Sequence, residues 1–98
     1  MSHTNNQLPI PPDAMTDPRS VEMVRAWIVN GGLQASLQMG VWEDVRAWGI
    51  LLADLVKYVA DAKEKDGGID RSHTIKQVRK SIDAELDAST CESEGEFV

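Results

Sequence analysis

Two places in the sequence combine side chains that could do acid–base or nucleophilic chemistry. Asp54 and Asp61 are separated by two helical turns, which puts both carboxylates on one face of a helix. A pair of carboxylates can act as general acid and general base when burial separates their pKa values. Lys57 lies on the same polar face, so solvated ion pairs are the favoured interpretation of these aspartates.

The second place is Ser72-His73, a hydroxyl next to an imidazole. Adjacent residues of a helix diverge by about 100°, so these two cannot act as a nucleophile and its base, and we interpret them as part of a helix start. The chain has one cysteine, Cys91, and two histidines, whereas structural zinc needs about four clustered ligands. The sequence therefore predicts no catalytic residue, no metal site and no cofactor.

Paired glycines in Asn30-Gly31-Gly32 raise the possibility of a phosphate-binding loop, which connects a strand to a helix. Here an alternating apolar segment follows, so a two-residue hairpin turn is favoured. Side chains then alternate between the two faces of the hairpin. The apolar face predicted from this register consists of Val24, Ala26, Ile28, Leu33, Ala35 and Leu37.

The same register places Trp27 on the opposite face of the hairpin beside Arg25, where the sequence offers no obvious cover for the indole ring. Trp42 precedes the next helix, and Ile50 projects among the charges of that helix's polar side. We predict these four residues, Arg25, Trp27, Trp42 and Ile50, as contacts to a partner or a ligand.

The expected elements are strands over residues 23–29 and 33–39 and helices over residues 45–65 and 71–88. A short helical turn near residues 18–22 precedes the first strand, although Pro18 and Gly31 would also suit a single helix over residues 18–30. In the first long helix, one face is predicted to form the core: Trp48, Leu51, Leu52, Leu55, Val56 and Val59. The second helix has a narrower apolar stripe, typical of a helix that lies in a groove or packs against a partner.

These elements predict an α+β fold in which the helices pack on the hairpin. Residues 1–17 form a proline-containing extended leader, residues 18–88 a single domain, and residues 89–98 a disordered acidic tail. No third strand is expected, and a two-stranded sheet is marginal in water. We therefore expect a homodimer that completes the sheet.

The formal net charge of −6 comes mostly from acidic residues near the two ends of the chain. Such a balance argues against nucleic-acid binding. No apolar run approaches the ~20 residues that cross a bilayer, and the N-terminus does not have the pattern of a secretory signal, so a cytoplasmic protein is expected.

Two segments, "RAWIVNGGLQASL" and "WEDVRAWGILLADLVKYVADA", resemble a family of small proteobacterial proteins classed only as a domain of unknown function. The resemblance covers about residues 11–88, and "WED…AWGILLADL" is its most specific part. One departure is Val45, where the family often has proline. The resemblance implies a stand-alone bacterial chain and brings no activity, cofactor or catalytic residue with it.

Two functions follow as hypotheses. The favoured one is a non-enzymatic homodimeric interaction or accessory protein, with an unidentified protein as a further partner. The alternative is a binder of small anions, or an enzyme, with a pocket at the dimer seam in which Arg25 holds the anionic group.

Overall fold

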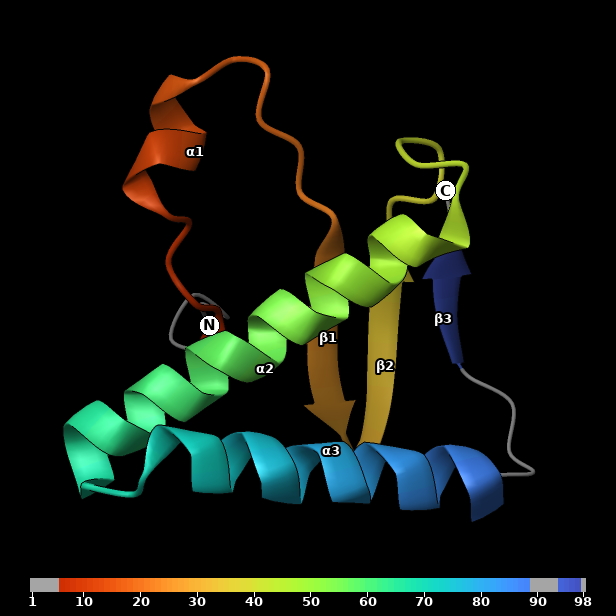
Figure 1. Ribbon diagram of the computed structural model, residues 1–98. Coiled ribbons are helices and arrows are strands. Elements are labelled where there is room, and N and C mark those ends of the chain that lie inside the picture. Colours follow the sequence, from red (N-terminus) through yellow and green to blue (C-terminus); the bar gives the residue numbers. More distant parts are fainter. Residues whose placement is uncertain (1–5, 89–93, 98) are drawn as a thin grey trace. The chain divides into compact units, whose positions relative to one another are not determined.

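The structure is a computed structural model that describes residues 6–88 and the backbone of residues 94–97. In chain order its elements are α1 (Pro12–Thr16), β1 (Val24–Val29), β2 (Gly32–Leu37), α2 (Val45–Gly67), α3 (Arg71–Ala88) and β3 (Glu94–Phe97), as labelled in Figure 1. They group into a sheet unit with α1 and the strands, and a helical unit with α2 and α3. A hairpin with two long helices confirms the predicted α+β class. The single domain over residues 18–88 stays a prediction.

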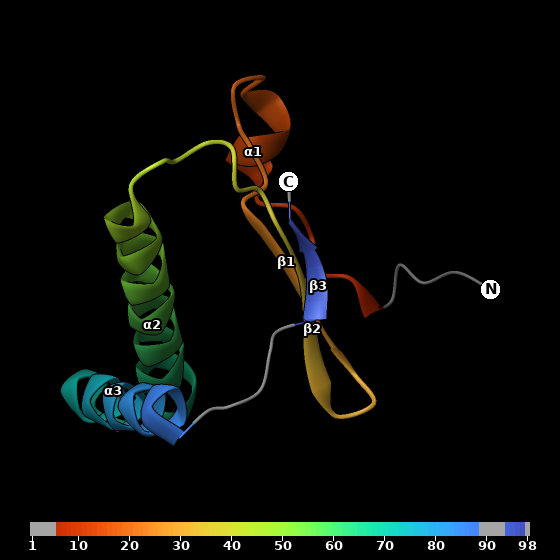
Figure 2. The ribbon, with the colours of Figure 1, turned by 90° about the vertical axis from the view of Figure 1, so that its right-hand side faces the viewer.

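A tight turn joins β1 to β2 in an antiparallel hairpin (Figure 2). Val29 pairs with Gly32, so the loop is Asn30-Gly31, and both residues have positive φ, 52° and 80°. Positive φ at both central positions defines the type I′ turn, whose twist matches that of the strands. This confirms the predicted two-residue loop and register, and Trp27 pairs with Gln34 on the opposite face as expected.

Replacing Gly31 with Ala is expected to lower the free energy of unfolding by roughly 1–2 kcal/mol, because a Cβ at positive φ is strained. The space around Gly31 is open, so the loss would come from the backbone alone. Gly32→Ala is the matched control: its Cβ would meet the Val29 carbonyl oxygen at an ordinary 3.7 Å. Urea unfolding of both variants checks this, and an equal loss in the two would contradict the turn assignment.

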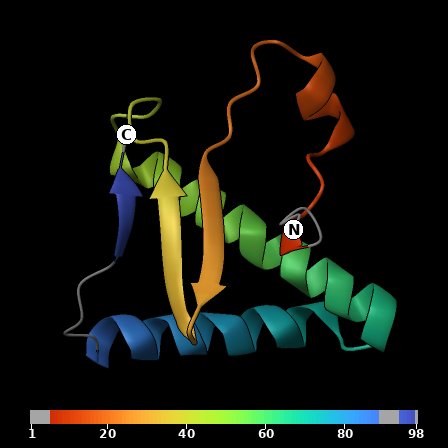
Figure 3. The same ribbon diagram turned by 180° about the vertical axis from the view of Figure 1, so that it is seen from behind.

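The sheet has three strands in the order β1-β2-β3 (Figure 3). The prediction of no third strand was therefore wrong, and residues 94–97 of the expected disordered tail form β3. Two glutamates and a glycine give this segment a low strand propensity, so its pairing in the sheet, a non-local interaction, overrides what the local sequence favours. The other residues of that tail, 89–93 and 98, lie outside the described residues.

The N-terminal segment also departs from prediction. One helical turn, α1, replaces part of the extended leader, since Pro12 at the first helical position is compatible with a helix start. The helical turn expected near residues 18–22 is wrong: Asp17 ends α1 and closes a turn, accepting the Ser20 N–H at 3.0 Å on its carbonyl and the Arg19 N–H at 2.9 Å on its carboxylate. The alternative single helix over residues 18–30 is excluded by β1.

Both long helices begin at the residues that their sequences predict, and α2 extends to Gly67, two residues beyond the predicted end at residue 65. The Asp44 carboxylate accepts the Arg46 N–H at 2.9 Å at the start of α2, and Gly68, with φ of 69°, ends it. At the start of α3, the Asp70 carboxylate accepts hydrogen bonds from the Ser72 hydroxyl and, at 3.1 Å, from the His73 N–H. Side-chain caps of this kind satisfy N–H groups that have no partner within the helix.

The hydrogen bond from Ser72, followed by that from the His73 N–H, lowers the pKa of Asp70 below the ordinary aspartate value. Since the folded-state pKa is the lower one, the cap stabilises the protein fully above the unfolded-state pKa and loses this effect as the pH falls through the folded-state pKa. Thermal unfolding of the wild type and Asp70→Asn should therefore show a Tm difference at neutral pH that narrows in acid. A difference independent of pH would contradict a charged cap.

Candidate interaction surface

The two helices of the helical unit are tied together at one end. Arg71 Nε lies 2.7 Å from Asp61 Oδ1, and the Arg71 backbone N–H donates to Glu64 Oε2 at 3.2 Å. Figures 1 and 3 show α2 and α3 meeting at this turn and diverging toward their other ends. Each helix has one buried residue, Ala60 in α2 and Thr74 in α3, and both lie in the half of the helix that is next to this junction.

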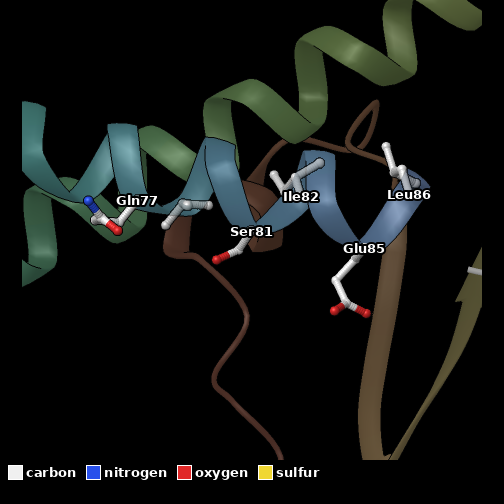
Figure 4. Close-up of a pocket in the computed structure, with 6 residues that line it drawn as sticks. Gln77, Ser81, Ile82, Glu85 and Leu86 are labelled. Carbon is white, nitrogen blue, oxygen red and sulfur yellow. The ribbon is translucent and has the colours of Figure 1, made fainter. Parts of the chain in front are cut away.

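The apolar side of α3 becomes more exposed with distance from the junction. The exposed fraction rises from 8% at Thr74 to 41% at Ile82 and 73% at Leu86. Figure 4 shows Ile82 and Leu86 projecting from one side of the helix and Ser81 and Glu85 from the other. An open groove of about 450 Å³, the α3 groove, is lined by Gln77, Val78, Ser81, Ile82, Glu85 and Leu86.

The predicted core face of α2 is largely uncovered. Leu52, Leu55 and Val59, here called the α2 stripe, are 55%, 46% and 45% exposed. Within the helical unit these three side chains are not buried, and the expectation that the hairpin covers this face of α2 stays a prediction. The stripe does not lie on the side of α2 that meets α3, because Ala60, the buried residue of α2, is roughly 100° around the helix from the stripe. Aliphatic side chains at this spacing, left half exposed, are typical of a surface that another element covers.

A second groove of about 450 Å³, the α2 groove, lies beside the α2 stripe. Its lining includes Trp42 and Ile50 together with Ala47, Leu51, Asp54, Leu55 and Tyr58. Trp42 packs edge-to-face on Trp48, with ring centroids 5.4 Å apart and an interplanar angle of 78°. Two of the four predicted contact residues thus line one groove. Tyr58 was missed, although it stands one helical turn beyond Leu55 on the same side.

The other two predicted contact residues lie in the sheet unit, two positions apart on β1. The Arg25 guanidinium is 3.0 Å and 3.3 Å from the two carboxylate oxygens of Glu22, so its charge already has a partner. Trp27 is half-buried.

The polar face of α2 carries ion pairs, as its sequence favours. Asp54 lies 3.7 Å from Lys57, and Asp61 pairs with Arg71. Among residues 6–88, no three His, Cys, Asp or Glu side chains gather in a way that could hold a metal ion. Neither α2 nor α3 is apolar enough over a sufficient length to cross a bilayer, and no other described helix is.

Comparison with known proteins gives a family and a related structure. Residues 7–90 match the family described as "Domain of unknown function (DUF5076)". Among solved structures, the chain is similar to a protein of the photosynthetic bacterium Rhodopseudomonas palustrus that is provisionally described as a pyruvate dehydrogenase. The two are 27% identical with a TM-score of 0.71, and the similarity covers 94% of each chain. No curated protein matches. The chain belongs to the DUF5076 family, whose function is unknown, as the sequence resemblance indicates.

Proposed function

We propose that the protein is a non-enzymatic homodimeric interaction protein and that its helical unit supplies the dimer interface. The exposure of the α2 stripe carries this proposal. The periodicity of α2 is that of a core helix, yet roughly half of each side chain in the stripe meets solvent. Completing the burial of one such side chain contributes about 1 kcal/mol.

A second copy of the chain is the occupant we favour for these surfaces. The α2 stripe, the α2 groove and the α3 groove all lie on one unit, so a symmetric contact could cover them together. Two-fold dimers are the commonest oligomers and use the same surface on both subunits. Packing of the sheet unit onto the helices of the same chain is the competing arrangement, and it predicts a monomer.

The sheet offers a second contact for the same dimer. Since β2 lies between β1 and β3, β1 is an edge strand of the described sheet. An edge strand presents unpaired N–H and C=O groups that can pair with a strand of another chain. Completion of the sheet by dimerisation would join β1 to the β1 strand of a second copy.

We do not favour the anion-binding alternative. The description of the related structure points to pyruvate, a small carboxylate. Arg25, the residue predicted to hold an anion, is engaged by Glu22. Among the described residues that line the α2 groove, the one charged side chain is Asp54, a carboxylate. A carboxylate repels an anion rather than holding it.

Light scattering coupled to size-exclusion chromatography tests the proposal at micromolar protein concentration. We expect a mass about twice the chain mass of 10.8 kDa. A monomeric mass would overturn the proposal and favour packing of the two units within one chain. In the same preparation, pyruvate at millimolar concentration should leave the melting temperature unchanged, and a clear rise would favour the anion-binding alternative.

A further inference from the structure

We propose that α3 is the self-association helix of the dimer, with two copies packed antiparallel so that each covers the α3 groove of the other. The inference rests on the proposed homodimer and names the element that forms it. Three observations carry the inference: the charge order along α3, the absence of partners for those charges in the described chain, and the position of the groove.

The charges of α3 are divided between its two halves. Its first half is basic and its second half acidic: Arg71, Lys76, Arg79 and Lys80, then Asp83, Glu85 and Asp87. This order opposes the helix dipole, which favours acidic residues near the start of a helix and basic residues near its end. Within the helix, Arg79 precedes Asp83 by four positions, the less favourable order for such a pair. An isolated α3 is therefore electrostatically unfavourable.

An antiparallel second copy removes this disadvantage. It sets the basic half of each helix against the acidic half of the other, whereas a parallel copy would oppose like charges. Apart from Arg71, which pairs with Asp61, the charged residues of α3 form no ion pair with another residue of the described chain. Charge complementarity in both halves is what a copy of the same helix provides.

The groove defines the register of this contact. Its lining runs from Gln77 to Leu86, so its centre is at Ser81 and Ile82. A two-fold axis there sets Ile82 opposite its own counterpart and Val78 opposite Leu86. Arg79 and Asp83 share one flank of the apolar side, one helical turn apart. The axis therefore brings Arg79 of one copy close to Asp83 of the second copy, twice in each dimer.

Two charge reversals in the full chain, Arg79→Asp and Asp83→Arg, test this contact. Each variant alone would oppose like charges at both symmetric positions, and we expect its dimer dissociation constant to rise about tenfold. Mixing the two variants pairs two basic side chains of one chain with two acidic ones of the other, so heterodimers should form with near wild-type affinity. Sedimentation equilibrium at low salt measures each dissociation constant, and native mass spectrometry counts heterodimers. Lys80→Asp is the control with the same charge change, because Lys80 is exposed and lies on the side of α3 opposite Ile82.

The outcomes separate the two proposals. A monomeric wild type would overturn both the homodimer and the α3 contact. A dimeric wild type whose dissociation constant is unchanged by either reversal would overturn the α3 contact and leave the homodimer standing. Weakening in each variant and recovery in the mixture support the antiparallel helix, and Lys80→Asp should then behave as the wild type. Circular dichroism verifies that each variant is folded, which we expect because both substituted positions are exposed.

Discussion

Replacing Leu55 with Asp is expected to raise the dimer dissociation constant about 100-fold or more. Leu55 belongs to the α2 stripe and also lines the α2 groove, so both apolar surfaces of α2 meet at this side chain. In the proposed dimer, the new carboxylate would be buried among aliphatic groups without a partner, at a cost of several kcal/mol. Light scattering over a dilution series would show a largely monomeric variant at concentrations where the wild type is dimeric.

Ala53→Asp provides the matched control for this prediction. Ala53 is exposed and lies on the opposite side of α2 from Leu55, so the same charge there should leave the dimer intact. If Leu55→Asp remained as dimeric as the control, α2 would not belong to the interface.

Ala60→Leu is expected to lower the free energy of unfolding by about 1–3 kcal/mol, which is the usual cost of overpacking. Ala60 is fully buried at the place where α2 meets α3, and a branched side chain would force the helices apart. Chemical denaturation followed by circular dichroism measures the loss.

The divergence of the helices predicts a different result for Ala53→Leu. Ala53 stands two turns earlier on nearly the same face as Ala60, but it is exposed, so the larger side chain should change stability by less than about 0.5 kcal/mol. Equal losses in the two variants would show that the helices are in contact along their whole length.

Short-range patterns explain which parts of the fold were predictable. The hairpin follows from Asn30-Gly31 and the alternation around it, and the two long helices follow from their caps at Asp44 and Asp70 and their helical periodicity. Each of these signals lies within a few residues of the element it determines. The α1 turn and β3 were not predicted, because the leader has competing proline signals and β3 depends on a strand far away in the sequence.

The candidate surface was predictable only in part, for a related reason. Periodicity shows that one side of a helix is apolar and does not show which element covers it. Periodicity therefore predicts the face with Leu55 as core and Ile50, off that face, as a contact. In the structure both line the α2 groove, while Arg25 and Trp27 belong to a separate unit.

The helical unit can open by rotation of α2 and α3 about their junction. The Arg71–Asp61 pair and the Arg71–Glu64 hydrogen bond hold only one end of the two helices. An α-helix of 23 residues is about 34 Å long, so a rotation of ~10° at the junction would move the far end by ~6 Å. Substitutions at Asp61, remote from both grooves, are thus expected to alter how widely the unit opens and therefore how tightly it binds.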